Sequence, residues 1–227
     1  MRLCIIGAQN TGKSTLIRHF LARWPMYTLP EKSYRDIIKE KNLSLNEAGN
    51  LESQKIIRDV LVDLALDNAG KTNTLHDRCA LDNLAYSLWL MENGKLDGGD
   101  EDASDFLATS IFMVKESMKF YDIIFWVPIN ANVPLVEAEN RSINIQYRQE
   151  IDNIFHGIYE HYKSNNGLLF DKENQPTVIP LEGELDQRLA TIAEYIGPDG
   201  KLVENETSAL TDLQTAYEED QLRRMVR

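Results

Sequence analysis

The chain has 227 residues, a formal net charge of −12 and a sequence pI near 4.8. This length suits one α/β domain with a sizeable core and an appendage, and it argues against two large domains. The acidic balance argues against a protein whose whole surface tracks nucleic acid, although it leaves room for a local basic cleft.

The chain begins with a short apolar strand and a glycine-rich loop. Residues 3–6 read Leu-Cys-Ile-Ile, as expected for a central parallel strand buried on both faces. Residues 7–14 read Gly-Ala-Gln-Asn-Thr-Gly-Lys-Ser, and an apolar helical pattern follows. This spacing is typical of a phosphate-binding loop (P-loop), whose backbone N–H groups surround phosphate oxygens at the positive end of a helix. We therefore expect ATP to contact Gly7, Ala8, Gln9, Asn10, Thr11, Gly12, Lys13, Ser14 and Thr15.

Two P-loop side chains have specific chemistry. Lys13 brings a positive charge to the terminal phosphates, and the Ser14 hydroxyl is a ligand for the magnesium ion that accompanies them. Because Lys13 serves only the phosphates, we expect its side chain to be exposed when the loop is empty.

A second predicted strand covers residues 26–29 and ends at Pro30-Glu31. Residues 33–41 are expected to be helical. Residues 44–47, Ser-Leu-Asn-Glu, have the pattern of a capping box, in which the serine and the glutamate satisfy each other's backbone donors. An apolar stripe then continues through Leu64, which predicts a helix that begins at the box.

The next predicted elements are a weak third strand at residues 72–76 and a helix at residues 80–92. The strand delivers Asp77 and Arg78 at its carboxyl end. Residues 94–102 are polar and broken by glycines, and we interpret them as a solvated loop.

The last third of the sequence contains the clearest strand. Residues 106–120 predict a helix, and residues 122–128 follow as Asp-Ile-Ile-Phe-Trp-Val-Pro. Residues 140–162 predict a helix that is polar on one side. A fifth strand at residues 177–181 and a closing helix at residues 184–196 follow, and the charged remainder has a weak helical pattern.

The two cysteines, Cys4 and Cys79, lack the spacing of a metal or redox motif, so we expect reduced thiols in a cytosolic compartment. No stretch reaches the apolar length of a membrane span, and the N-terminal segment reads as a strand instead of a signal peptide. The sequence therefore predicts a cytoplasmic protein with no membrane partner. A phage-encoded protein that acts in the host cytoplasm is an alternative within this prediction.

Five strands that alternate with helices predict a three-layer α/β fold with a five-stranded parallel sheet, a P-loop NTPase fold. Ligands in such sheets bind beyond the carboxyl ends of the strands. The P-loop, Pro30-Glu31 and Asp77-Arg78 each follow a predicted strand, so we expect them to converge on one cleft.

Two classes of P-loop protein fit poorly. A regulatory GTPase needs an Asn-Lys-x-Asp guanine-reading motif, which does not occur in the sequence. A remodelling ATPase needs an apolar strand that ends in Asp-Glu, whereas the strand at residues 122–128 runs into Pro-Ile-Asn. Phosphotransfer to a small acceptor remains, and there catalysis is mostly positioning and electrostatic stabilisation.

Residues 74–87 carry a resemblance to a known family. Their Asp77-Arg78-x-x-x-Asp82-x-x-Ala85-Tyr86 pattern resembles a segment of the nicotinamide riboside kinase domain and of related P-loop nucleoside and nucleotide kinases. Glu31 and Arg35 look like the Glu-x-x-Arg element of that family, with a spacing one residue longer.

Two later stretches extend the resemblance over residues 1–197. Residues 140–148 are similar to the family's lid, and residues 181–183 with Arg188 resemble the loop and helix beside the adenine. The resemblance implies a kinase domain at 1–197 with a helical lid at about 140–165, followed by a charged tail or appended helix at 198–227. It also places Gly183 in the ATP site.

The candidate roles follow from the chemistry of transfer. Glu31 is the proposed base that takes the acceptor's proton, unless it is only a carboxylate favoured at a helix start. Asp77 is expected to hold magnesium together with Ser14, unless it only pairs with Arg78. Arg78 suits phosphate oxygens because a guanidinium offers two parallel donors. Arg35, Arg78 and Tyr86 form the predicted acceptor side.

Arg141 and Arg148 are seven residues apart, which returns both to nearly the same helical face. A closing lid would bring both charges to the phosphates and exclude water. The alternative is a solvated, charged helix surface.

The sequence thus predicts an ATP- and magnesium-dependent kinase of a nucleoside, a nucleotide or a related small acceptor. One rival is a phage-type kinase of hydroxymethylated bases in DNA. The other is a nucleotide-binding regulatory ATPase module. The oligomeric state stays open.

Overall fold

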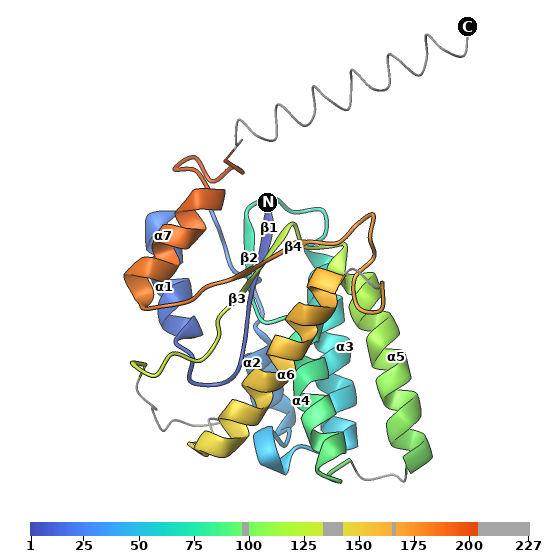
Figure 1. The fold of residues 1–227 in the computed structure, drawn as a ribbon. Coiled ribbons are helices and arrows are strands. Elements are labelled where there is room, and N and C mark those ends of the chain that lie inside the picture. The colour runs from blue at the N-terminus through green and yellow to red at the C-terminus, as the bar shows by residue number, and fades with distance from the viewer. Residues whose placement is uncertain (97–99, 134–142, 165–166, 204–227) are drawn as a thin grey trace, which may run out of the picture.

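A computed structural model of the protein describes residues 1–96, 100–133, 143–164 and 167–203. Its centre is a parallel sheet in the order β2-β1-β3-β4 (Figure 1). Neighbouring side chains of β1 point to opposite faces, and both faces are buried, as the run of apolar residues predicts. The four strands are β1 (Arg2–Ile6), β2 (Thr74–Asp77), β3 (Ile123–Trp126) and β4 (Thr177–Pro180).

Helices cover both faces of the sheet, so the predicted three-layer α/β fold is confirmed. On one face α1 (Lys13–Arg23) and α7 (Leu185–Tyr195) pack against each other and on the sheet. On the other face lie α3 (Leu51–Asp67), α4 (Ala80–Glu92), α5 (Asp100–Met118) and α6 (Ile145–Ser164). The remaining short helices are α2 (Tyr34–Lys41), which packs against α3, and a 3₁₀ turn at Asn46–Ala48.

The second predicted strand, at residues 26–29, is reduced to a single parallel bridge between Thr28 and Thr74. Pro25 and Pro30 flank this segment. Because proline has no N–H to donate to a ladder, the pairing cannot extend in either direction beyond these positions. The hydrogen-bonded sheet therefore has four strands in the described part of the chain.

The helix predicted to begin at the capping box of residues 44–47 begins later. Ser44 N–H donates to Ser53 Oγ at 3.2 Å, and α3 is capped by Asn50, whose Oδ1 accepts from Ser53 N–H at 2.9 Å. A capping box does form at the start of α2, between Ser33 and Asp36. A four-residue pattern is not enough to decide which polar residue caps a helix.

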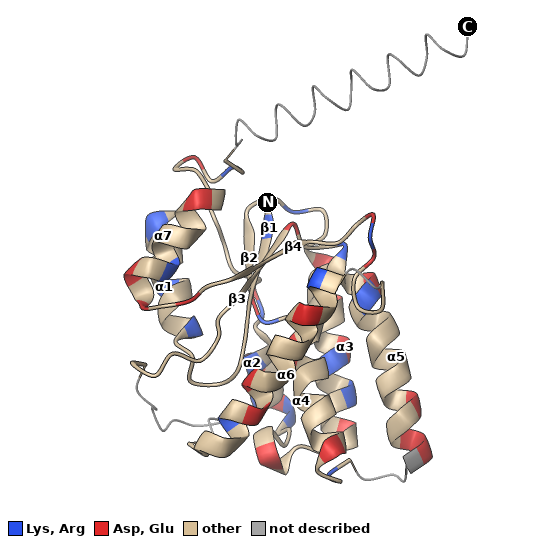
Figure 2. Ribbon diagram, in the orientation of Figure 1, with Lys and Arg blue, Asp and Glu red and all other residues tan. Residues whose placement is uncertain are grey.

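Helix α5 begins at Asp100, inside the segment predicted to be a solvated loop. Glu101 and Asp102 occupy its first turn, where carboxylates are favoured by the helix dipole. The other predicted helices appear with shifted ends. Acidic and basic residues lie on helices and loops, whereas the strands at the centre of Figure 2 are mostly uncharged.

Residues 197–203 stay on the domain after α7. Trp24 Nε1 donates to Gly197 O at 2.9 Å, and Tyr27 OH donates to Gly200 O at 2.8 Å. The domain boundary at residue 197 remains a prediction, because residues 204–227 lie outside the described part. Both cysteines are buried free thiols. In the described ranges, no helix is both long and apolar enough to span a membrane.

Candidate functional site

The P-loop lies at the carboxyl end of β1. In the sheet, β1 lies between β2 and β3, so the next two strands of the chain are added on opposite sides of β1. This is the position at which ligands bind in open α/β sheets. Gly7 has a φ of 137°, and a Cβ at this position would lie 2.5 Å from Val127 O. Gly12, with a φ of 90°, leads directly into α1. Glycine is therefore required at both positions, first for a close backbone approach and then for a left-handed turn.

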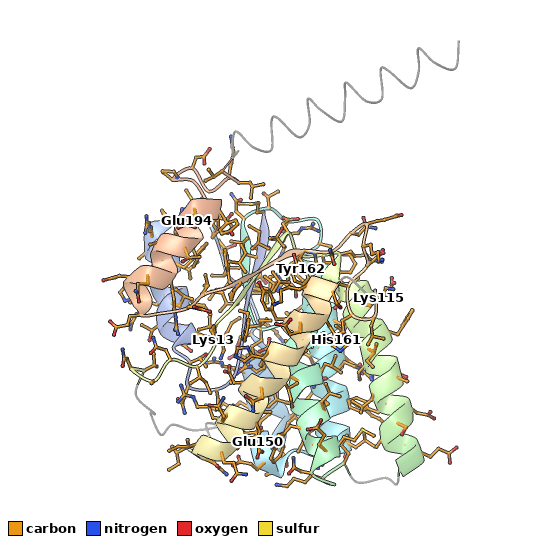
Figure 3. The ribbon with its side chains drawn as sticks, viewed as in Figure 1. Lys13, Lys115, Glu150, His161, Tyr162 and Glu194 are labelled. Carbon is orange, nitrogen blue, oxygen red and sulfur yellow. The ribbon has the colours of Figure 1, made fainter. Side chains whose placement is uncertain are left out.

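Lys13 is the first residue of α1 (Figure 3), and it is only 5% exposed. Its Nζ donates to Ala8 O and to Thr11 Oγ1, the latter at 3.2 Å. Burial lowers the pKa of the Lys13 ammonium well below its usual range. The expectation of an exposed lysine was wrong, because the side chain folds back over the P-loop and uses its carbonyl and hydroxyl oxygens as partners.

Arg78 and Asp82 form the polar centre of the site. Arg78 has a φ of 82°, which is unusual for a residue with a side chain and typical of functional sites. Its Nη1 lies 2.6 Å from Asp82 Oδ1, and Asp82 also accepts hydrogen bonds from the N–H groups of Gly7 (3.3 Å) and Cys79 (3.2 Å). Asp82 thus connects the P-loop to the segment after β2.

Asp82 was part of the family pattern, but sequence reasoning assigned it no role. The available signal was its position four residues after Arg78, which places the two side chains within reach of each other. The alternative in which Arg78 pairs with Asp77 is wrong, since the partner of Arg78 is Asp82.

Two tyrosines contact the Arg78 guanidinium. Arg78 Nε donates to Tyr34 OH at 2.8 Å, and its guanidinium carbon lies 5.7 Å and 5.4 Å from the ring centroids of Tyr34 and Tyr86. Tyr86 OH donates to Gln9 Oε1 at 3.1 Å, so it also contacts the P-loop. The predicted acceptor residues Arg78 and Tyr86 are therefore adjacent to the phosphate site.

Arg35 lies between the two predicted magnesium ligands. Its Nη2 is 3.0 Å from Asp77 Oδ2 and 3.4 Å from Ser14 Oγ. Asp77 Oδ1 is buried and has no hydrogen-bond partner in the described ranges. A carboxylate with an unsatisfied buried oxygen beside a hydroxyl suits Mg²⁺, which binds few protein oxygens and keeps several waters. These residues fit a magnesium ion.

A cavity of about 180 Å³ extends from the P-loop to the space between α2, α3 and α4. A water molecule needs roughly 10–15 Å³ by such a measure, so the cavity accommodates an organic molecule. Its lining combines P-loop residues with the predicted acceptor residues: Gln9, Asn10, Thr11, Gly12, Lys13, Ser14, Thr15, Tyr34, Arg35, Ile38, Leu45, Asn46, Gln54, Ile57, Leu61, Arg78, Asp82, Asn83 and Tyr86.

Glu31 and Gly183 lie apart from this lining. Glu31 is exposed in the segment before α2. Gly183 occupies the turn between β4 and α7 with a φ of 77°. Arg188, on α7, is 2% exposed and donates from Nη1 to the P-loop carbonyl of Thr11 at 2.6 Å, so α7 supports the P-loop from behind.

Arg141 falls outside the described residues, whereas Arg148 lies on α6 and is 6% exposed. The solvated-surface alternative is therefore wrong for Arg148. Its Nε and Nη2 are buried without partners in the structure as described, and Asp152 one turn later accepts from Ile129 N–H at 3.2 Å.

Helix α6 packs into the core through Tyr147, whose ring centroid lies 4.5 Å from that of Trp89, and through Ile151, Phe155 and Ile158. Residues 145–164 therefore form part of the helical layer, and a lid that moves remains a prediction.

The fold and part of the sequence are similar to those of known proteins. A family model described as an AAA domain, AAA_28, matches residues 2–166. No curated protein matches the sequence. Among solved structures, NadR in complex with NR is 16% identical, with 89% of this chain and 52% of NadR covered and a TM-score of 0.58. The chain thus spans about half the length of NadR.

Two further solved structures are covered almost completely. Thymidylate kinase from Candida albicans is 15% identical, with 89% of this chain and 94% of that enzyme covered and a TM-score of 0.60. Deoxyadenosine kinase from M. mycoides, with dCMP and dCDP bound, is 14% identical, with 86% and 97% covered and a TM-score of 0.57. At these identities the likeness concerns the fold.

Proposed function

The chain belongs to the AAA_28 family of AAA domains and has a P-loop nucleoside/nucleotide kinase-like fold, and we propose that it is an ATP- and magnesium-dependent phosphotransferase. The proposed acceptor is a nucleoside, a nucleotide or a related small molecule. Two of the similar structures are kinases of a nucleoside or a nucleotide by name, which supports this assignment.

One observation carries the proposal. A single cavity is lined by the P-loop and, beyond it, by a pocket of mixed apolar and polar side chains that includes Arg78. A protein that only binds a nucleotide needs the P-loop alone. A transferase needs both, because most of its rate enhancement comes from holding the two reactants next to each other.

The donor side is formed by the P-loop and its supports. Backbone N–H groups of the P-loop would hold the phosphates, while Lys13 would leave its contacts with Ala8 and Thr11 to bind the terminal phosphates. Gly183 remains the proposed contact beside the adenine. ATP supplies the phosphoryl group that is transferred.

Ser14 and Asp77 would hold magnesium, whose charge stabilises the phosphate oxygens during transfer. Arg35 now lies between these two residues and would have to move aside. It would then be available to the acceptor, in agreement with its predicted role.

On the acceptor side Arg78 and Tyr86 would orient the acceptor, and Glu31 is the proposed base. Glu31 is exposed and lies just before α2, so it would reach the acceptor hydroxyl only if this segment closes over the cavity. Arg148, and Arg141 with it, would bring positive charge to the transferred group.

The proposal is tested with ATP labelled on its γ-phosphate and a panel of acceptors. The panel contains ribonucleosides, deoxynucleosides, their 5′-monophosphates and DNA that contains hydroxymethyluracil. We expect labelled product with a free nucleoside or nucleotide, and with Glu31→Gln we expect a rate roughly 100- to 10,000-fold lower with ATP affinity unchanged. Unchanged transfer in this variant would remove Glu31 from the mechanism.

Two other results would contradict the assignment. Label that enters only the DNA would support the DNA-base kinase. If no acceptor stimulates ATP consumption, the regulatory ATPase module becomes the better interpretation.

A further inference from the structure

Arg188 on α7 is a buried cation that contacts the P-loop backbone. Its side chain carries a guanidinium, which stays protonated in proteins, yet the residue is 2% exposed. Its Nη1 donates to Thr11 O at 2.6 Å, and its Nη2 donates to Pro128 O at 3.4 Å. One guanidinium therefore connects the P-loop to the segment that follows β3.

The Arg188 guanidinium has no counter-charge among the described residues. Both of its hydrogen bonds go to neutral carbonyl groups, and its Nε is buried without a partner there. Burial alone lowers its pKa, with no opposing contribution from a carboxylate. A buried charge without a partner is costly, so packing does not explain why a cation occupies this position. The position suits a cation whose counter-charge arrives with a ligand.

Two helix starts and a lysine add to the positive charge at this place. Gly12 is the N-cap of α1, Lys13 follows it, and Arg188 lies in the first turn of α7, which packs beside α1 (Figure 1). Helix N-termini carry a partial positive charge, which disfavours a cation in the first turn. Glu184 and Asp186, the carboxylates closest to Arg188 in the sequence, are exposed. Helix stability therefore does not account for Arg188 either.

The contact with Thr11 also orients one peptide group of the P-loop. The Thr11–Gly12 peptide is trans, so its C=O and N–H groups point in opposite directions. Because Arg188 holds the Thr11 carbonyl, the Gly12 N–H points away from Arg188. A Cβ on Gly12 would lie 3.2 Å from Arg188 Nη1, so the glycine leaves room for this contact. An arginine and a glycine together set the direction of one P-loop N–H group.

We propose that Arg188 is a positioning residue for the phosphate chain of the donor. It keeps the Gly12 N–H turned toward the phosphates, and its charge attracts them from the other side of the Thr11–Gly12 peptide. The ligand that supplies the missing counter-charge is a polyphosphate anion. This inference rests on the proposed function and deepens it, because the family resemblance implies only that Arg188 lies beside the adenine.

The test uses inorganic tripolyphosphate, which carries a phosphate chain like that of ATP without a base or a sugar. Its binding to the full chain, and that of ATP, is measured by calorimetry. We expect Arg188→Met to weaken both by about 10- to 100-fold, the effect of one lost hydrogen bond from a charged group. Arg188→Lys keeps the charge but not the planar fork, so its affinity should lie within about fivefold of the parent's.

Arg23→Met is the matched control. Arg23 also donates across the contact between α1 and α7, to Leu189 O at 3.5 Å, but it is exposed and lies in the last turn of α1. An exposed charge at the far end of α1 is screened by solvent and salt, so tripolyphosphate affinity should be unchanged in this variant.

Two further measurements separate positioning from folding. Arg188→Met removes two hydrogen bonds but also an uncompensated buried charge, so we expect the urea midpoint of the unliganded protein to stay near that of the parent. In steady-state assays the KM for ATP should rise more than kcat falls, and the KM for the acceptor should stay the same. If Arg188→Met does not fold, Arg188→Gln replaces it, because glutamine keeps a donor for Thr11 O without the charge.

Unchanged tripolyphosphate affinity in the uncharged variant would overturn the inference. So would a loss with ATP alone, which would assign Arg188 to the adenine. An equal loss in Arg188→Met and Arg188→Lys, together with a lower urea midpoint, would also overturn it and make Arg188 a residue of the core. The proposed function can fail separately: if no acceptor receives phosphate while tripolyphosphate binding responds as expected, Arg188 positions phosphates in a protein that is not a transferase.

Discussion

Asp82 and Arg78 are joined by a buried ion pair of 2.6 Å, with side chains that are 2% and 11% exposed. The same carboxylate accepts the Gly7 N–H at the start of the P-loop. The pair therefore holds together two segments whose contacting residues, Gly7 and Asp82, are 75 residues apart in the sequence. Any change that breaks it affects the shape of the P-loop as well as the position of Arg78.

Asp82→Asn should be strongly destabilising. The change leaves the Arg78 charge buried without its counter-charge, for which the cost is about 3 kcal/mol or more. Urea unfolding of the protein without ligand measures this directly. Glu116→Gln, which breaks the exposed pair with Lys119, is the control, and it should cost less than about 1 kcal/mol. Equal effects of the two changes would contradict the structural role of Asp82.

Lys13→Met should separate stability from activity. The Lys13 ammonium is buried, and burial opposes its charge, so its removal should leave the free energy of unfolding unchanged or increase it. Transfer should fall by about a thousandfold, the scale of one lost charge contact in the transition state. Thermal melting with and without MgATP shows whether ATP still stabilises the variant. A melting temperature far below that of the parent would show that the contacts of Lys13 with Ala8 and Thr11 stabilise the fold.

Asp77→Asn should raise the magnesium concentration needed for half-maximal transfer. The expected increase is about tenfold or more, because a charged ligand is replaced by a neutral one. Binding of Mn²⁺ in the presence of ADP, followed by electron paramagnetic resonance, gives a second measurement that does not depend on turnover. Arg35→Gln provides the converse test, since the loss of the cation that now neighbours Asp77 and Ser14 should strengthen Mn²⁺ binding. Unchanged metal affinity in both variants would contradict the proposal that Asp77 and Ser14 hold the magnesium ion.

Arg148→Met should leave the fold intact and lower transfer by a hundredfold or more. Arg148 Nε and Nη2 are buried without partners in the described structure, which is costly unless a ligand uses them. Chemical unfolding and steady-state turnover, measured on the same preparation, check both expectations. Arg18→Met, at an exposed position on α1, is the control. A large loss of stability with normal turnover would instead assign Arg148 to the core.

His76 should make the protein acid-sensitive. Burial, with a smaller contribution from Lys71, lowers its pKa from 6.5 to about 4. The unfolded chain therefore takes up a proton between pH 6.5 and 4 that the folded protein does not, and stability falls as the pH decreases through this range. The loss attributable to His76 is about 2 kcal/mol at pH 5 relative to pH 7.

His76→Phe is the variant that tests this sensitivity, because a ring is kept against Tyr121, which contacts His76 edge-on at 5.2 Å. Urea midpoints at pH 7 and pH 5 should differ less in His76→Phe than in the parent. If the two proteins lose stability equally, other groups cause the acid sensitivity.

Local sequence patterns were sufficient to predict those elements whose backbone conformation depends mainly on neighbouring residues. The strand at residues 3–6, the P-loop and the helix at residues 80–92 are short-range features, whose composition and spacing leave little choice of conformation. The capping-box prediction at residues 44–47 failed because several polar residues competed for the same helix start, and Asn50 provides the cap. The strand at residues 26–29 is reduced to one bridge, at Thr28, and its flanking prolines prevent the pairing from extending beyond the segment.

The sequence by itself determined the fold class, the phosphate site and the group of residues that gather around it, because parallel strands bring their carboxyl ends to one edge. Only the tertiary structure decided the partners within that group. Arg78 forms an ion pair with Asp82, and Asp77 forms one with Arg35. Lys13 donates a hydrogen bond to the P-loop itself, and Gln54 on α3 is hydrogen-bonded to Asn83 on α4. These contacts depend on the rotation and packing of α2, α3 and α4, and such long-range geometry leaves no periodic signal in the chain.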